Sequence, residues 1–294
     1  MNTNNLLSHR NKEPERSVLY IVGTPIGNLD DFSIRGINIL KKVSLIACED
    51  TRNTGRLLKH FNISNKLISF NEHNSQKRLD YFISILNEGQ SIAVVSDAGM
   101  PLISDPGESL VKKAKINDFD VICIPGPCAA ITALVSSGID ASKFSFYGFL
   151  PKTSLDRRIL MKEINENNKT SIIYESPKRI VKLLNDLKNI CGGDREIVLL
   201  KELTKRYEKH FGDNIDDVLK TIQKSDPKGE YTLIISGIHK VKNDKLIDNK
   251  DFIIDLKNLI KAGLSHSAAA NYLSKKSGFP KNQIYKLIIK SNIK

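Results

Sequence analysis

The sequence predicts an α/β protein with two α/β regions and a small helical domain after them, and three observations lead to this fold class. Short β-branched apolar runs alternate with helical patterns along most of the chain. Glycine and proline cluster directly after several of these runs. Beyond Gly237 the strand-like runs stop and only helical patterns remain. The alternation is typical of βαβ units and a mainly parallel sheet.

The first α/β region is predicted to contain four buried strands with helices between them. Continuous apolar runs bounded by turn residues predict the strands, at Val18–Val22, Val43–Ala47, Ile92–Val95 and Val121–Ile124. Apolar residues at helical spacing predict the helices, at Ile34–Lys42, Thr54–Phe61, Ser75–Glu88 and Gly107–Asn117.

A second α/β region follows a linker that we expect near Phe149–Lys152. Its predicted strands are Ser171–Tyr174, Glu196–Leu200 and Tyr231–Ile235. Its predicted helices are Pro177–Ile190 and Asn214–Lys224.

The C-terminal region is basic and helical. Residues 238–294 hold twelve lysines and four aspartates, a net charge of +8 out of +12 for the whole chain. Helices are expected at Asp251–Lys261, Ser265–Lys276 and Lys281–Lys290, with Ser265 as a cap and one apolar face made by Leu264, Ala268, Ala269 and Leu273. Lys281 and Lys286 on the last helix would suit contacts with an RNA backbone. A basic helical cap with a purely structural role is the alternative.

The composition argues against a membrane protein, a secreted protein and a protein held together by metal ions or disulfides. No apolar run approaches the roughly 20 residues that span a bilayer, and Met1–Arg16 lacks the apolar core of a signal peptide. We therefore expect a disordered leader over residues 1–17 of a cytoplasmic protein that does not bind membranes. The four cysteines form no C-x-x-C pair, so neither a metal site nor a disulfide framework is predicted. Cys48 and Cys123 lie in apolar runs, which favours buried thiols.

Three glycine- and proline-rich loops follow predicted strands, at residues 23–28, 97–101 and 125–127. Ligands of open α/β sheets bind outside the carboxyl ends of the strands, so the three loops predict one binding rim. The first loop, GTPIGN, has neither the G-x-G-x-x-G dinucleotide fingerprint nor the G-K-[ST] of a phosphate-binding loop.

Charged residues lie near the same predicted edge. Asp97 can accept a hydrogen bond from a ligand, or cap a turn. Glu49, Asp50 and Arg52 end another strand, where a functional role is weighed against ordinary surface charge. Asp105, followed by proline, is expected to cap a helix.

Eight segments taken in order resemble the small-subunit ribosomal RNA methyltransferase I family of the tetrapyrrole methylase (class III methyltransferase) superfamily. The resemblance covers residues 18 to about 290. The segments are LYIVGTPIGNLDD (19–31), IACEDTRNTGRLL (46–58), VVSDAGMPLISDPG (94–107), PGPCAAITAL (125–134), YGFLP (147–151), YESPKR (174–179), KELTK (201–205) and KGEYTLII (228–235).

The resemblance implies S-adenosylmethionine as cofactor, folded in a cleft between two α/β domains at 18–128 and 129–237, with a helix-turn-helix-like domain at 238–294. It also implies a homodimer that 2′-O-methylates a cytidine ribose of 16S rRNA (cytidine 1402, in the decoding region), as naked RNA or in the small ribosomal subunit. The family's cofactor contacts correspond here to Pro25, Asp97, Cys128, Ala129, Tyr174, Glu175, Leu203 and Thr232.

Methyl transfer from a sulfonium is an in-line displacement, so the enzyme must hold the attacking oxygen behind the methyl carbon. A ribose hydroxyl is a poor nucleophile, and the candidate bases are Glu49, Asp50 and Glu202. Arg52, Lys178 and Arg179 are expected to contact phosphates. Two alternatives stay open, namely carbon methylation of a porphyrin precursor and RNA binding without catalysis.

Overall fold

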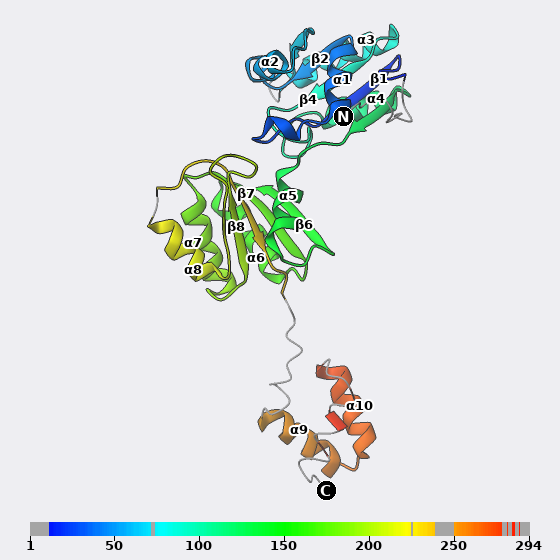
Figure 1. The fold of residues 1–294 in the computed structure, drawn as a ribbon. Helices are drawn as coiled ribbons and strands as arrows, with labels where there is room; N and C mark the ends of the chain where they lie inside the picture. The colour runs from blue at the N-terminus through cyan, green and yellow to red at the C-terminus, as the bar shows by residue number, and fades with distance from the viewer. Residues whose placement is uncertain are drawn as a thin grey trace, which may run out of the picture. The chain divides into compact units, whose positions relative to one another are not determined.

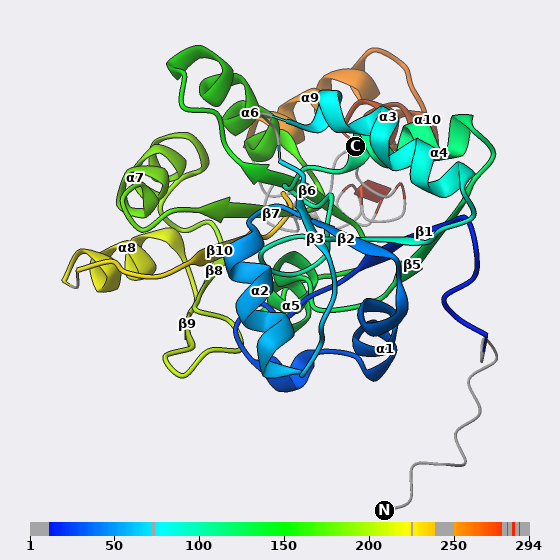
Figure 2. The ribbon, with the colours of Figure 1, turned by 90° about the horizontal axis from the view of Figure 1, so that it is seen from above.

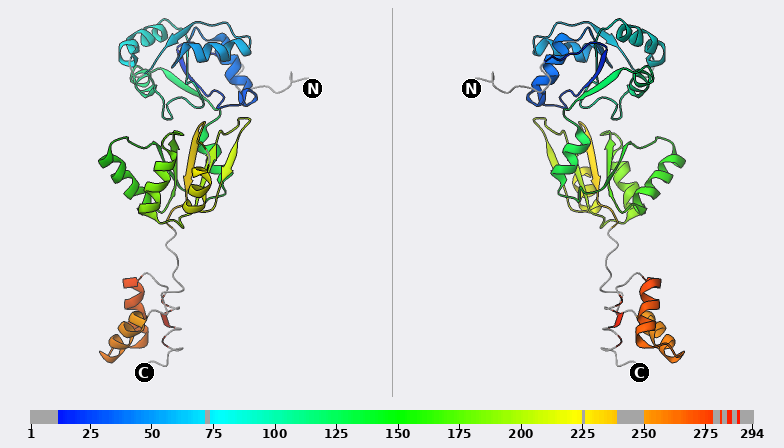
Figure 3. Two further views of the ribbon diagram at one scale, coloured as in Figure 1. Left: turned by 90° about the vertical axis from the view of Figure 1, so that its left-hand side faces the viewer. Right: turned by 90° about the vertical axis from the view of Figure 1, so that its right-hand side faces the viewer.

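The computed structural model describes residues 12–71, 74–224, 226–238, 250–277, 281, 284–285 and 288. The chain divides into two compact units, which we call the α/β unit (residues 1–237) and the tail unit (residues 238–294). In Figure 3 the colours run from blue to blue-green through the first sheet and from green to yellow through the second, so the α/β unit is built in two successive parts.

The first sheet is entirely parallel, as the alternation of strands and helices predicts. Its spatial order is β3-β2-β4-β1-β5 (Figure 1). The strands are β1 (Val18–Val22), β2 (Leu45–Cys48), β3 (Leu67–Ser69), β4 (Ile92–Val95) and β5 (Asp120–Ile124). Strand β3 was not predicted, because three residues are too few to show a periodic pattern.

Helices cover both faces of this sheet, with α1 and α2 on one side and α3 and α4 on the other (Figure 2). Their bounds are Ile34–Lys42, Thr51–His60, Ser75–Asn87 and Glu108–Ile116. Burial on two faces explains why β1, β2 and β4 are continuous apolar runs rather than alternating ones. Because the strands are parallel, the loops after β1, β2, β4 and β5 all leave from one edge.

The second sheet is mixed, with the order β6-β7-β10-β8-β9. Only β6 and β7 run parallel; β10 pairs antiparallel with both β7 and β8, and β8 with β9. The strands are β6 (Phe144–Phe149), β7 (Thr170–Glu175), β8 (Ile197–Lys201), β9 (Lys209–Phe211) and β10 (Tyr231–Ile235).

Helix α5 (Ala129–Ser137) packs on one face of the second sheet. The other face carries α6 (Ser154–Glu166), α7 (Ile180–Cys191) and α8 (Ile215–Gln223). The predicted linker near Phe149–Lys152 is wrong. Strand β6 pairs with β7, and Leu150 is 1% exposed in the core beneath α6 and α7, so this segment lies inside the second part.

Two further expectations need correction. Residues 12–17 of the predicted disordered leader make defined contacts, including a Glu13–Arg35 ion pair of 2.6 Å and a hydrogen bond from Ser17 Oγ to the Leu86 carbonyl. Residues 1–11 of that leader lie outside the described residues. Cys48 is buried as expected, but Cys123 is exposed because β5 is an edge strand that is only partly covered.

The tail unit has its own small apolar core, formed by Leu256, Ala270, Leu273, Ile284 and Ile288. Helix α9 spans Lys250–Lys261, and α10 spans His266–Ser277. Ser265 Oγ accepts a hydrogen bond from the Ala268 N–H, which confirms the predicted cap. Ala269 and Leu273 are buried as predicted, whereas Ala268 is exposed, so the apolar face passes through Ala270 instead. Within the described part of the chain, no helix is long and apolar enough to cross a membrane.

Candidate active site

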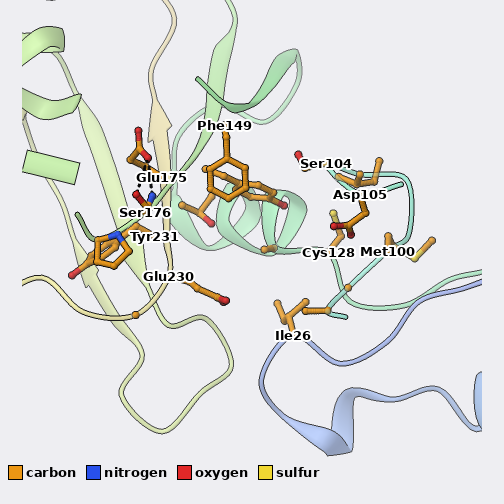
Figure 4. A pocket seen from close by; sticks show the side chains of 18 residues that line it. Ile26, Met100, Ser104, Asp105, Cys128, Phe149, Glu175, Ser176, Glu230 and Tyr231 are labelled. Atoms are coloured by element: carbon orange, nitrogen blue, oxygen red, sulfur yellow. Dashed lines mark hydrogen bonds between the residues drawn. The ribbon is translucent and has the colours of Figure 1, made fainter. Parts of the chain in front are cut away.

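A pocket of about 320 Å³ lies where the loops of the first sheet face the second sheet, and we call it the apolar pocket. Figure 4 shows Ile26, Met100 and Cys128 on one side and Phe149 and Tyr231 on the other. Small-molecule sites are commonly apolar concavities of about 300–1,000 Å³ with a few polar groups. Asp105, Glu175 and Glu230 supply charged groups here. Both size and lining therefore suit a cofactor with a flat heterocycle and a cationic centre.

The loop after β1 is held against the loop after β4 by backbone hydrogen bonds. The Thr24 N–H donates to the Gly99 carbonyl at 2.9 Å, and the Gly99 N–H donates back at 3.1 Å. Beside this bridge, Gly23 and Gly126 pack backbone to backbone. A Cβ at Gly126 would lie 2.8 Å from Gly23 Cα, a distance that side-chain carbons do not adopt. The two glycines thus let the β1 and β5 loops meet.

Gly126→Ala is therefore expected to destabilise the α/β unit by about 1–3 kcal/mol, because the new methyl group must displace backbone. It should also weaken cofactor binding, since it moves the loop that carries Cys128. Gly55→Ala in α2 is the control, because its Cβ would meet only Leu67 at 3.8 Å. That change should stabilise by about 0.5–1 kcal/mol. Urea unfolding measures the free energy of unfolding of both variants. If the two substitutions change it by the same amount and in the same direction, the contact between Gly23 and Gly126 does not limit the side chain at residue 126.

The second sheet forms the opposite wall through β7 and β10. Tyr174 and Thr232 are paired residues of these strands, and both line the apolar pocket. The Ala130 N–H at the start of α5 donates to Tyr174 Oη at 2.9 Å, which fixes the ring across the pocket. The Phe149 ring packs edge-on against Tyr174, with centroids 5.7 Å apart. Burial raises the pKa of the Tyr174 hydroxyl, so this group stays neutral.

Glu175 anchors a buried charge network at the end of β7. Its Oε1 accepts hydrogen bonds from the Ser176 N–H and from Arg179 Nε, both within 2.8 Å. Its Oε2 lies 3.7 Å from Arg157 Nη1, and both side chains are almost fully buried. The residue lines the apolar pocket, and protein groups already hold its Oε1, whereas its buried Oε2 accepts no hydrogen bond from the described residues.

A second pocket, the polar pocket, adjoins the first and has a volume of about 620 Å³. Glu49, Asp50 and Arg52 line it together with Asp97, so the structure brings these predicted residues together. Asp97 Oδ1 accepts from the Asp50 N–H at 3.2 Å, and Asp97 Oδ2 accepts from Asn53 Nδ2 at 2.7 Å. Ser104 lines both pockets, so the two share a wall.

Of the eight predicted cofactor residues, five line the apolar pocket, namely Cys128, Ala129, Tyr174, Glu175 and Thr232. Pro25 and Asp97 line a groove beside α2 that shares Ile26, Ala98 and Glu230 with that pocket. Leu203 lines neither and packs beneath, in an apolar cluster with Ile26 and Ala130.

The three candidate bases differ in their surroundings. The Arg52 side chain and backbone N–H donate to Asp50 and lower the pKa of its carboxyl to about 2. Burial would raise the pKa of Glu202, but hydrogen bonds from Lys205 and the Glu230 N–H lower it overall. Glu202 lines neither the apolar nor the polar pocket. Glu49 lies in the polar pocket, close enough to Asp105 to affect its ionisation.

Asp105 is not the helix cap that the sequence predicts. Helix α4 begins at Glu108 with Gly107 at its N-cap position. Asp105 instead lines the apolar pocket, where burial and the charges of Glu49 and Asp97 raise its pKa to about 6. The sequence alone does not distinguish the two roles, because an aspartate before proline is also a common helix-start signal.

The predicted phosphate-binding residues divide into two kinds. Lys178 is exposed in the turn that precedes α7. Arg179 is tied to Glu175, and Arg52 pairs with Asp50 at 2.6 Å, so both already have carboxylate partners. Lys281 is exposed on the tail unit, and Lys286 lies outside the described residues.

Comparison with known proteins resolves the family. The model of the tetrapyrrole (corrin/porphyrin) methylases matches residues 18–219. A Vibrio cholerae protein named ribosomal RNA small subunit methyltransferase I is 46% identical over 79% of this chain and 81% of its own length. An Escherichia coli O157:H7 protein of the same name is 41% identical over 95% of this chain and 96% of its own. The chain belongs to the ribosomal RNA small subunit methyltransferase I family.

Solved structures place this family in a known fold. A uroporphyrin-III C-methyltransferase from Thermus thermophilus superposes with a TM-score of 0.52 at 15% identity, over 75% of this chain and 94% of that one. A cobalt precorrin-4 methyltransferase superposes with a TM-score of 0.53 at 14% identity, over 75% and 95%. The predicted fold class, two α/β parts of the tetrapyrrole methylase type with helices after them, is confirmed.

Proposed function

We propose that the chain transfers a methyl group from S-adenosylmethionine to a ribose 2′-hydroxyl of small-subunit ribosomal RNA, at a cytidine. The names of relatives that are 40–46% identical over most of the chain support the ribosomal RNA substrate. The observation that carries the chemistry is the apolar pocket joined to the polar pocket at Ser104. A small cofactor and a hydroxyl-bearing substrate can meet at that shared wall.

The apolar pocket would hold the cofactor through residues from both parts of the α/β unit. Cys128 and Ala129 would present the backbone at the start of α5, while Tyr174, Glu175 and Thr232 form the opposite wall. Pro25 and Asp97 would reach it from the neighbouring groove, and Leu203 would support Ile26 from below. When bound, S-adenosylmethionine supplies an electrophilic methyl carbon on a cationic sulfur.

The polar pocket suits a ribose better than a porphyrin precursor. Glu49, Asp50 and Asp97 line it, and carboxylates accept hydrogen bonds from sugar hydroxyls. A porphyrin precursor carries many carboxylates of its own, and like charges brought together disfavour binding. Contacts to phosphates would come from cations outside this pocket, such as Lys178 and Lys281.

Transfer of a labelled methyl group tests the proposed function. The chain is incubated with methyl-labelled S-adenosylmethionine and, separately, small ribosomal subunits, naked 16S rRNA or uroporphyrinogen. We expect label in the RNA and, after alkaline hydrolysis, in a resistant dinucleotide, because a 2′-O-methyl group blocks cleavage at the next phosphate. Label in mononucleotides would indicate base methylation, and label in the porphyrin would favour that substrate. Cofactor binding without any transfer would indicate an RNA-binding protein.

The cytoplasmic location and the homodimer remain predictions. Analytical ultracentrifugation of the purified chain tests whether it is a dimer.

A further inference from the structure

We propose that Asp105 is the catalytic base that takes the proton from the attacking ribose hydroxyl. This inference rests on the proposed function and assigns a residue that neither the sequence motifs nor the comparisons single out for catalysis.

Asp105 lies where the apolar and polar pockets meet. Ser104 lines both pockets, Asp105 lines the apolar pocket, and Pro106 lines the polar pocket. These three consecutive residues therefore form the wall where a hydroxyl from the polar side would approach the methyl donor. Figure 4 shows Ser104 and Asp105 together on the side of the pocket opposite Glu175. Glu49 and Asp50 line the polar pocket but not the apolar pocket, and Glu202 lines neither pocket.

The backbone on both sides of Asp105 forms a strained turn. Leu102 and Ser104 have φ angles of +72° and +66°, a left-handed conformation that is strained for residues other than glycine. Gly107 follows with φ +140°, and a Cβ there would lie 2.9 Å from Leu102 Cδ1. The strained turn separates Asp105 from the first turn of α4, so its carboxylate faces the pocket instead of capping the helix.

Charged side chains from other elements lie close to Asp105 and affect its ionisation. Glu49 follows β2, Asp97 follows β4, and Tyr174 and Cys128 face the same region from β7 and the start of α5. Burial, and then repulsion from Glu49, raise the pKa of Asp105 to about 6. The Ser96 hydroxyl acts in the opposite direction, and the charge of Asp97 adds a weaker upward effect. A base works best when its pKa lies close to the working pH, so that it is ionised and still binds a proton firmly. Asp50, with a pKa of about 2, is a far weaker base.

The step balances without a further reactant. The ribose 2′-oxygen forms a bond to the methyl carbon as the bond from that carbon to the sulfonium sulfur breaks. The sulfur keeps the electron pair, and the hydroxyl proton passes to an Asp105 carboxylate oxygen. Asp105 then returns the proton to water once the product leaves.

Asp105→Asn tests the assignment, because it keeps the shape of the side chain and removes the base. In full-length protein with small ribosomal subunits, we expect turnover to fall by about 10²–10⁴-fold. Cofactor affinity, measured by calorimetry, should change only a few-fold. Wild-type turnover should also fall below about pH 6, where Asp105 becomes protonated. Asp105→Glu should keep part of the activity. Asp80→Asn, at an exposed carboxylate on α3 that pairs with Lys113, should have full activity.

Thermal unfolding supplies a readout that does not depend on activity. A folded-state pKa near 6, above the ordinary value of 3.8, means that ionising Asp105 costs stability as the pH rises from about 4 to 6. Asp105→Asn should therefore unfold at a higher temperature than the wild type above pH 6, with the difference vanishing near pH 4.

The outcomes separate two failures. If the wild type methylates ribose and Asp105→Asn keeps its turnover, or loses cofactor binding in parallel with turnover, the assignment of Asp105 is overturned alone. If the wild type transfers no methyl group to RNA, the proposed function fails and the assignment fails with it. If Asp105→Asn and the wild type unfold at the same temperature at every pH, the pKa of Asp105 is not raised in the folded protein.

Discussion

Replacing Glu175 with alanine is expected to lower the free energy of unfolding of the α/β unit by about 3–5 kcal/mol. Glu175 and Arg157 are 2% and 7% exposed, so the guanidinium of Arg157 would lose a carboxylate that water cannot replace. Asp186 still contacts Arg157 Nε at 3.1 Å, but from the more exposed side. The Ser176 N–H and Arg179 would lose hydrogen-bond acceptors as well.

Urea unfolding followed by circular dichroism measures this loss. Glu166→Ala is the matched control, because its pair with Lys162 is 3.9 Å long and exposed, and such pairs contribute about 0.2–0.5 kcal/mol. Replacing both Glu175 and Arg157 with methionine should recover most of the stability, since no fully buried charge is left. Arg179 and Asp186 lose a partner in this variant, but their side chains are 26% and 32% exposed, so water can solvate them. A double variant as unstable as Glu175→Ala would show that the buried arginine is not the cause.

Removing residues 238–294 is expected to weaken binding to ribosomal RNA strongly while cofactor affinity stays unchanged. All residues of the apolar and polar pockets belong to the α/β unit, and each unit has its own apolar core. The removed segment carries a net charge of +8. Each phosphate contact contributes roughly 0.7–0.9 to the slope of log K against log salt concentration. A loss of three contacts would thus reduce the slope by about 2–3.

Filter binding at several salt concentrations measures the slope, and calorimetry of the shortened chain checks the cofactor. Lys281→Glu in the full-length chain is a milder test, because Lys281 is exposed on the tail unit. If the shortened chain binds RNA with the same affinity and the same salt dependence as the full chain, the tail unit is a structural cap. That result would favour the alternative that the sequence leaves open.

Local patterns were sufficient to predict much of the fold. Strands β1 and β4 were predicted at their observed bounds, because a strand buried on both faces is a continuous apolar run. Helix α1 was predicted at its observed bounds from its amphipathic spacing, and Ser33 caps it. The grouping of the loops after β1, β4 and β5 follows from the parallel sheet, since parallel strands end at one edge.

Long-range contacts decided the rest. Strand β6 is partly exposed at a sheet edge and carries no clear periodicity, so only its pairing with β7 defines it. The Asp-Pro-Gly sequence at residues 105–107 predicts a helix start, but in the structure the Asp105 carboxylate lies in the apolar pocket. The reason is the turn before it, where Leu102 and Ser104 adopt the left-handed conformation. The ionisation of Asp105 and Asp50 depends on burial and on neighbours brought from other parts of the chain. A sequence pattern records only local backbone and burial preferences, whereas the energy of a charge depends on everything within a few ångströms of it, which only the folded chain determines.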